Sequence, residues 1–182
     1  MFSFRASLVR SWKPLTLGAC MALVPALASA GSPEPDYVQT GIIVRKGPSG
    51  VDYTVVHEVK SRPSAKSATA LVDADVPKRF RIIPARPLRC DVFKTQLRVG
   101  LLRNGMSRTA ADSLLAACSG QAIAAHGRIV VAYSPATKIT TLSIEKMGTT
   151  QVTGLPAMKS VWGVWLGSSD SAQEKRDLSS KF

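Results

Sequence analysis

Histidine, cysteine and aromatic residues are scarce in this chain of 182 residues. It contains two histidines and three cysteines, and aromatic residues make up 6% of it. There is no CxxC pair and no cysteine–histidine cluster, so we expect no zinc or haem site, no other metal site and no cofactor. No Ser-His-Asp, Cys-His, phosphate-loop or paired-carboxylate arrangement stands at an interpretable spacing, so no common catalytic motif can be assigned.

Acidic residues are also few. The chain has 24 lysines and arginines against 12 aspartates and glutamates, a net charge of +12. Such a charge could suit nucleic acid, anionic lipid or acidic sugar. However, the cations are scattered, the densest cluster being Lys78-Arg79-x-Arg81, and no aromatic residues are interleaved with them to stack bases. We therefore interpret them as a soluble basic surface and expect no nucleic-acid partner.

Long apolar runs are absent except near the start. Residues 1–30 are typical of a cleaved signal peptide: a basic beginning without acids, an apolar run over 14–27, and the small-residue site Ala28-Ser29-Ala30. The run is too short, and too interrupted by proline, to predict a stable membrane span. A lipoprotein box ending at Cys20 is a second interpretation, which the apolar residues beyond Cys20 disfavour. The sequence thus predicts a periplasmic or secreted protein.

Cleavage after Ala30 would leave 21 basic and 12 acidic residues, a net charge of +9. The remaining chain has the length of one domain, which we place at 40–182 after a Pro/Gly/Ser-rich linker at 31–39. Two cysteines remain, Cys90 and Cys118. An oxidising compartment allows them to form a disulfide, but two buried thiols fit the sequence equally well.

The first half of this domain predicts a hairpin. Strand signals occupy Tyr37–Arg45 and Val51–Lys60, with a Gly/Pro/Ser turn between them, and Lys78–Ile83 predicts another strand. His57 falls on the apolar face of its strand, where a hydrogen-bonded core histidine is more common than a catalyst. Residues 61–69 indicate a surface connection or a short helix.

Two helices follow. Asp91 is a fair N-cap for a helix through about Arg103, whose buried face we expect to hold Phe93, Leu97, Leu101, Val92 and Leu102. Thr109 is expected to cap the next helix, with Asp112 in place of the usual capping-box glutamate.

Three strands and a helix come next. The strands are expected at 128–133, 139–145 and 149–153, joined by short turns as a meander. Pro156 suits the first turn of a helix with an apolar stripe that includes Met158, Trp162 and Trp165. Ser171-x-x-Glu174 predicts a short terminal helix. The order of elements predicts an α+β fold, an antiparallel β-sheet with a layer of α-helices on one face.

The stretch GRIVVAYSPATKITTLSI and, further on, VTGLPAMKSVWGVWLG resemble the C-terminal signature of bacterial chalcone isomerase-like proteins. The resemblance rests on Tyr133, Pro135, Thr141, Gly154 and Trp165-Leu166-Gly167. The Pro-Gly-x-Gly turn of the family is replaced here by Pro-Ala-Thr-Lys. The strand that follows Pro77 also resembles one of the family, so the likeness covers roughly residues 40 to 167 and implies the chalcone isomerase-like fold.

This resemblance implies a ligand cleft between sheet and helices, with an arginine at the end of the first hairpin. Gly41-Ile-Ile-Val-Arg45 matches that arginine, and the family's threonine corresponds to Thr54. A guanidinium offers a planar donor fork to an oxyanion. We expect the cleft walls to include Phe93, Leu97, Met158 and Trp162.

Binding without catalysis is the function that this cleft predicts. The plant isomerases use a tyrosine and an asparagine where this chain has Phe93 and Gly100, neither of which donates the hydrogen bond needed. An apolar cleft with one arginine suits a fatty acid or similar amphipathic carboxylate. The alternative is an isomerase, an intramolecular lyase acting on a chalcone-like or other unsaturated small molecule through Arg45 and Thr54. A third hypothesis is a structural envelope protein without a ligand.

Overall fold

The structure is a computed structural model that describes residues 37–47, 50–167 and 172–181. The expected signal peptide at 1–30, Cys20 and most of the expected linker lie outside the described residues. The described residues all belong to one unit, Pro35–Phe182.

One six-stranded sheet forms the centre of this unit, with strand order β1-β2-β3-β6-β7-β8 and every neighbouring pair antiparallel. Its strands are β1 (Val38–Gly47), β2 (Gly50–Val59), β3 (Lys78–Pro84), β6 (Ile129–Ser134), β7 (Ile139–Ile144) and β8 (Gly148–Thr153). The hairpin and the meander predicted from the sequence are both present, and β1 begins at Val38, within the expected linker. Two short strands that were not predicted, β4 (Leu88–Arg89) and β5 (Ala122–Ile123), pair with each other.

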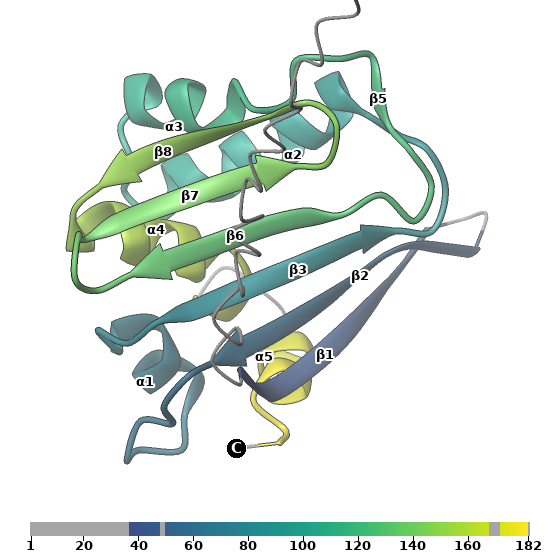
Figure 1. Ribbon diagram of the computed structural model, residues 1–182. Coiled ribbons are helices and arrows are strands. Elements are labelled where there is room, and N and C mark those ends of the chain that lie inside the picture. The colour runs from purple at the N-terminus through teal and green to yellow at the C-terminus, as the bar shows by residue number, and fades with distance from the viewer. Residues whose placement is uncertain (1–36, 48–49, 168–171, 182) are drawn as a thin grey trace, which may run out of the picture. The chain divides into compact units, whose positions relative to one another are not determined.

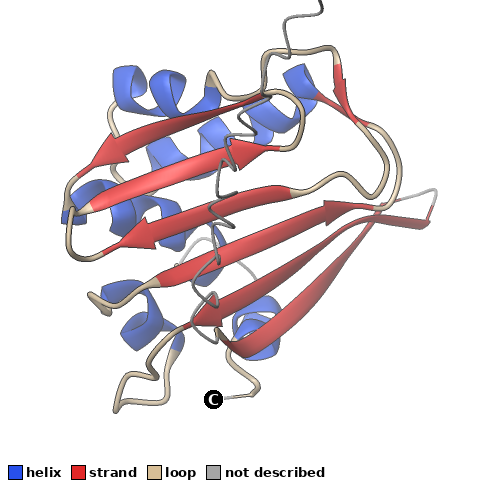
Figure 2. Cartoon of the chain, in the orientation of Figure 1, coloured by secondary structure: helices blue, strands red, loops and turns tan. Residues whose placement is uncertain are grey.

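The helices lie on one face of the sheet, as Figures 1 and 2 show. They are α1 (Ala68–Asp73), α2 (Cys90–Arg103), α3 (Arg108–Leu115), α4 (Leu155–Leu166) and α5 (Ala172–Leu178). The α+β class, an antiparallel sheet with helices on one face, is therefore confirmed. Helix α4 packs against α1, α2 and α5, and α5 also packs against β1.

Strand alternation explains which face is buried. In β3, Phe80 and Ile82 are buried towards the helices, whereas Arg79 and Arg81 point to the other face and both pair with Glu58. The same period of two puts Val55 of β2 and Val131 of β6 into the helix-facing core. Burial of this face drives the layers together.

Helix boundaries differ from the predicted ones in two places. Helix α2 begins at Cys90 with Arg89 at the N-cap position, so Asp91 lies in the first turn instead of capping it. Helix α3 is capped by Ser107, whose Oγ accepts from the Ala110 amide, and Asp112 pairs with Arg98. The N-caps differ from the predicted ones because the N-cap position belongs to the residue whose backbone stays extended. The nearest suitable polar side chain does not decide it. Val92, expected in the core, is 40% exposed.

Two glycines allow α2 and α4 to approach closely. A Cβ on Gly100 would lie 3.0 Å from a methyl of Val164, and one on Gly163 would lie 2.4 Å from the Asn104 side-chain oxygen. Asn104 follows the last residue of α2, and its carbonyl accepts from the Ser160 hydroxyl of α4 at 2.8 Å. The two helices are therefore held at a fixed spacing on the sheet.

A chain of hydrogen bonds crosses the core through His57, which is completely buried. The indole Nε1–H of Trp162 can only donate, and it points at His57 Nε2, 2.9 Å away. The ring proton must then sit on Nδ1, which donates to Thr40 Oγ1 at 2.6 Å, and the Thr40 hydroxyl donates to the Leu178 carbonyl at 3.1 Å. This chain joins α4, β2, β1 and α5, and it agrees with the prediction of a hydrogen-bonded core histidine.

Lys78 is a second buried polar residue beside Trp162. Its Nζ donates to the carbonyls of Leu71 and Val72 in the last turn of α1, at 2.8 and 2.9 Å, and lies 4.9 Å from the Trp162 ring centre. Burial lowers the pKa of Lys78 to about 7. The ammonium thus satisfies helix-end carbonyls that would otherwise lack donors.

Cys90 and Cys118 form a disulfide, with a Cα–Cα distance of 5.7 Å. The bond ties the first residue of α2 to the segment after α3. It therefore fixes the end of α2 from which Phe93 projects.

Replacing both cysteines, in Cys90→Ser/Cys118→Ser, is expected to lower the free energy of unfolding by about 3 kcal/mol. The bond closes a loop with a sequence separation of 28, which restricts the unfolded chain. Urea unfolding of the oxidised wild type and the double variant measures the difference. Equal stabilities would show that the crosslink contributes nothing.

Acid is expected to destabilise the fold through His57. Burial, and next the charge of Lys78, lower its pKa from 6.5 to about 3. Between these values the unfolded chain binds a proton that the folded chain does not. The free energy of unfolding should therefore fall as the pH drops from about 6.5 towards 3, by about 1 kcal/mol per pH unit. Urea titrations across this window measure the slope.

His57→Gln is the variant that tests this dependence, because it removes the titrating ring. Its slope should be flatter than that of the wild type. His126→Gln, which removes the other histidine, on the surface, is the matched control. The attribution to His57 is wrong if His57→Gln and the wild type show the same slope.

Candidate functional site

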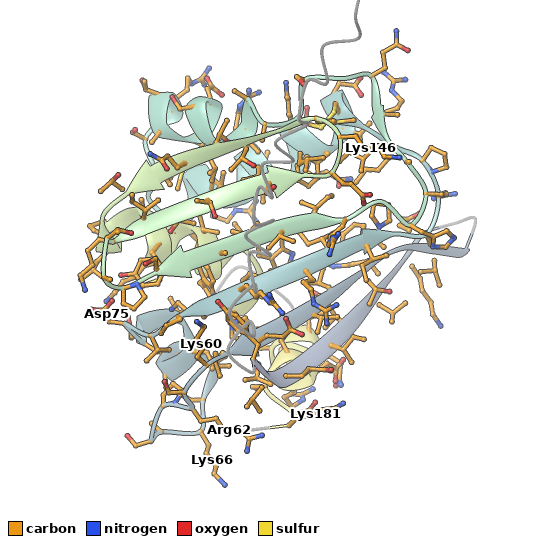
Figure 3. The ribbon with its side chains drawn as sticks, in the orientation of Figure 1. Lys60, Arg62, Lys66, Asp75, Lys146 and Lys181 are labelled. Atoms are coloured by element: carbon orange, nitrogen blue, oxygen red, sulfur yellow. A yellow bond between two sulfur atoms is a disulfide. The ribbon has the colours of Figure 1, made fainter. Side chains whose placement is uncertain are left out.

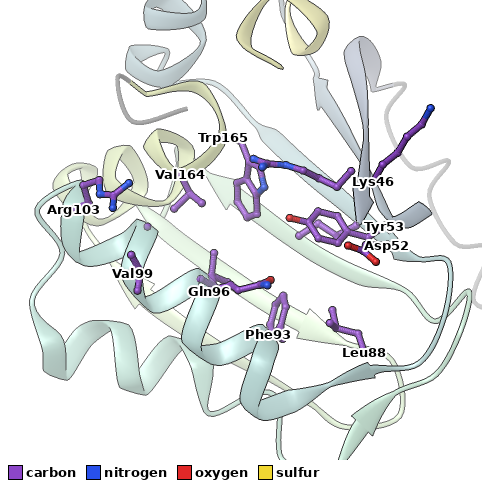
Figure 4. Close-up of a pocket in the computed structure, with 14 residues that line it drawn as sticks. Lys46, Asp52, Tyr53, Leu88, Phe93, Gln96, Val99, Arg103, Val164 and Trp165 are labelled. Carbon is purple, nitrogen blue, oxygen red and sulfur yellow. The ribbon is translucent and has the colours of Figure 1, made fainter. Parts of the chain in front are cut away.

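A cavity of about 360 Å³ lies between the end of the β1–β2 hairpin, helix α2 and the last part of α4 (Figure 4). Its walls combine apolar and polar side chains: Arg45, Lys46, Asp52, Tyr53, Ile82, Leu88, Phe93, Gln96, Leu97, Val99, Gly100, Arg103, Val164 and Trp165. Ligand sites in proteins commonly have this size and mixture.

Arg45 and Tyr53 face each other across the hairpin at the edge of the cavity. They are directly paired in the β1–β2 register, and both side chains line the cavity. The Arg45 guanidinium also pairs with Glu174 of α5, with 2.7 Å between Nη2 and Oε2. Arg45 therefore combines a charged donor group with access to solvent, since its side chain is 36% exposed.

Thr54, which the family resemblance placed beside Arg45, lies elsewhere. Successive residues of a strand point to opposite faces, and Tyr53 shares the helix-facing side of β2 with Val55, whereas Thr54 points to the other side. Thr54 is absent from the walls of the cavity. Alternation along the strand puts Tyr53 on the same face as His57, which the sequence assigns to the apolar side, and this signal could have identified Tyr53.

The four apolar residues expected in the cleft divide into two pairs. Phe93 and Leu97 of α2 line the cavity, as expected. Met158 and Trp162 of α4 are fully buried in the core instead. The cavity lies against the C-terminal end of α4, so the helix presents Val164 and Trp165 to it, one turn further on. The expected placement of Met158 and Trp162 in the cleft is corrected accordingly.

Positive charge predominates around the cavity. Arg45, Lys46 and Arg103 line it, against one acidic lining residue, Asp52. Glu174 offsets the charge of Arg45, so Lys46 and Arg103 supply the excess. Asp52 forms an ion pair with Arg86, which lines an adjoining cavity. The potential around the cavity thus favours an anion, and the apolar wall formed by Phe93, Leu97 and Trp165 favours an apolar group beside it.

The adjoining cavity, of about 320 Å³, extends the site along the start of α2. It shares Asp52, Tyr53, Leu88 and Gln96 with the first cavity. The two hollows therefore offer a continuous surface to an elongated molecule. Sequence reasoning missed Gln96, because a polar residue on a helix is usually a solvated one.

Neither a membrane span nor a metal centre is found in the described residues. None of their helices combines the length and the apolar character that crossing a bilayer requires. Within the same ranges, histidine, cysteine and acidic side chains form no group of three or more that could hold an ion.

Comparison with known proteins places the fold. No protein-family model matches the sequence, and no curated protein matches it. Among solved structures, the architecture matches the chalcone isomerase-like fold. One such match is the crystal structure of a fatty-acid binding protein from Arabidopsis thaliana. It covers 80% of this chain and 88% of that chain, with a TM-score of 0.61 and 16% sequence identity. The likeness confirms the predicted fold.

Proposed function

We propose that this protein binds a fatty acid or a similar amphipathic carboxylate in the cavity beside the β1–β2 hairpin. The observation that carries the proposal is the pairing of Arg45 with Tyr53 across the hairpin, next to the apolar wall of Phe93, Leu97 and Trp165. A carboxylate would accept hydrogen bonds from the guanidinium and the phenol, while its tail would cover the apolar side chains.

The similarity to a plant fatty-acid binding protein supports this assignment at the level of the fold. The adjoining cavities support it as well, because they share four lining residues and together suit a molecule longer than it is wide. We therefore favour a linear ligand with one anionic end over a compact polar metabolite.

Catalysis of the chalcone isomerase type is the less favoured alternative. Phe93 and Gly100 stand in the cavity wall where the resemblance places a tyrosine and an asparagine of the plant enzymes. Neither side chain donates a hydrogen bond to a developing oxyanion, and each missing donor would raise the barrier by a few kcal/mol. Thr54, the other residue assigned to this alternative, does not line the cavity.

We also propose that the protein is secreted or periplasmic, with residues 1–30 removed as a signal peptide. The basic, apolar and small-residue order of that segment supports export. The Cys90–Cys118 disulfide supports it independently, because such bonds persist in oxidising compartments. The alternative is that the protein is a lipoprotein, with the lipid attached at Cys20.

Binding of laurate tests the function, by native mass spectrometry and by calorimetry. We expect one laurate per chain. Arg45→Ala should weaken binding by about 10- to 100-fold, because a hydrogen bond to a charged group is worth about 1.5–3 kcal/mol. Thr54→Ala should bind like the wild type, since its side chain lies outside the cavity walls.

Arg62→Ala is the matched control for charge. Arg62 is exposed and lies beyond the end of β2 that is remote from the hairpin (Figure 3). It should leave laurate binding unchanged. The proposal fails if no laurate binds, or if Arg45→Ala binds it as well as the wild type. Turnover of a chalcone above the spontaneous rate, lost in Arg45→Ala, would favour the isomerase instead.

Tryptophan fluorescence can locate the ligand. Trp165 lines the cavity and Trp162 is buried behind it, so laurate should change the emission of Trp165 alone. Trp165→Phe should abolish the laurate-induced change, whereas Trp162→Phe should keep it. The third tryptophan, Trp12, lies in the proposed signal peptide and is unchanged in both variants, so it cannot cause a difference between them. The reverse result would place the ligand beside Trp162, which was expected in the cleft wall from the sequence.

A further inference from the structure

Helix α5 lies directly on the inner face of β1. A Cβ on Gly41 would lie 2.2 Å from the Asp177 carbonyl oxygen, so only glycine permits this approach. Leu178 is completely buried, its carbonyl accepts from Thr40 Oγ1, and the Lys181 amide donates to the Thr40 carbonyl at 2.8 Å. The C-terminal end of α5 is therefore fixed to the sheet.

Glu174 lies one turn before Leu178, on the same side of α5. The docking of Leu178 brings the Glu174 carboxylate to Arg45, with 2.7 Å between Oε2 and Nη2. The guanidinium that would anchor a ligand is thus already bound to a carboxylate of the chain itself. Only 21% of the Glu174 side chain is exposed, against 36% of the Arg45 side chain.

We infer that Glu174 is an internal counter-ion of the ligand anchor, which an anionic ligand must displace. This inference rests on the proposed function. In the empty protein, Glu174 neutralises Arg45 and holds it at the cavity edge. When a carboxylate enters, it replaces the Glu174 carboxylate on the guanidinium, and the Glu174 side chain turns to solvent while the end of α5 at Leu178 stays in place.

Such an exchange makes Glu174 a specificity-determining residue. An anionic ligand binds more weakly than it would to an unpaired arginine, because the Arg45–Glu174 pair must be broken. A neutral ligand with the same tail leaves the pair intact and is unaffected by it. The pair is partly exposed, so its contribution is small, equivalent to a change in affinity of about two- to fivefold.

Calorimetric titration with laurate and dodecanol tests this inference. The two ligands share one tail length and differ in the charge of the head. Glu174→Gln, which keeps the shape of the side chain, should bind laurate about two- to fivefold more tightly than the wild type. Its affinity for dodecanol should equal that of the wild type. Glu174→Ala should likewise bind laurate more tightly and dodecanol equally well. This second variant excludes an effect of the glutamine amide itself.

Asp177→Asn is the matched control. It changes the net charge by the same amount on the same helix, but the Asp177 carboxylate accepts a hydrogen bond from Gln173. Its laurate affinity should not change, which separates local exchange from long-range electrostatics.

Three outcomes would overturn the inference. Weaker laurate binding by Glu174→Gln would make Glu174 a residue that positions Arg45 for the ligand. Unchanged laurate binding would show that the pair does not compete. Equal tightening for dodecanol would show that the substitution merely opens the cavity. Failure of the proposed function looks different, because laurate would then not bind the wild type at all. In the three outcomes above the wild type still binds laurate.

Discussion

A neutral imidazole in the core positions helix α4, which borders the cavity, and helix α5, which carries the partner of Arg45. His57 accepts from Trp162 of α4 and donates to Thr40, which in turn donates to the last residue of α5. A protonated ring has two donors and no acceptor, so it could not keep the bond to the indole. The buried position of His57 maintains the neutral form, and the neutral form keeps α4 and α5 attached to the first two strands.

The composition of the cavity follows from this attachment. Helix α4 presents Trp165 to the cavity because Trp162 is held by His57, one turn earlier. Helix α5 presents Glu174 to Arg45 because Leu178 is held by Thr40. An apolar wall and a neutralised cation therefore meet at the end of the hairpin, where a sheet edge gives access to solvent. The same polar chain that stabilises the core determines which side chains a ligand would contact.

The local predictions succeeded where one segment contains the whole signal. The meander was predicted because β-branched runs separated by short turns form strands without help from distant residues. Phe93 and Leu97 were placed on the buried side of α2 because the helical period alone assigns a face. The caps at Asp91 and Thr109 were wrong, since several polar residues compete for each helix start and packing selects among them.

The sequence by itself determined the order of the main strands and helices and most of the residues on their buried faces. These depend on periodicity and on residue chemistry, which act over a few neighbouring positions. The candidate Arg45 came from the family resemblance instead. Only the tertiary structure decided that Tyr53, and not Thr54, stands opposite Arg45. It likewise decided that Trp165 replaces Trp162 in the cavity and that Glu174 reaches the guanidinium. Those contacts join segments far apart in the chain, so they are set by strand register and by the depth at which each helix docks.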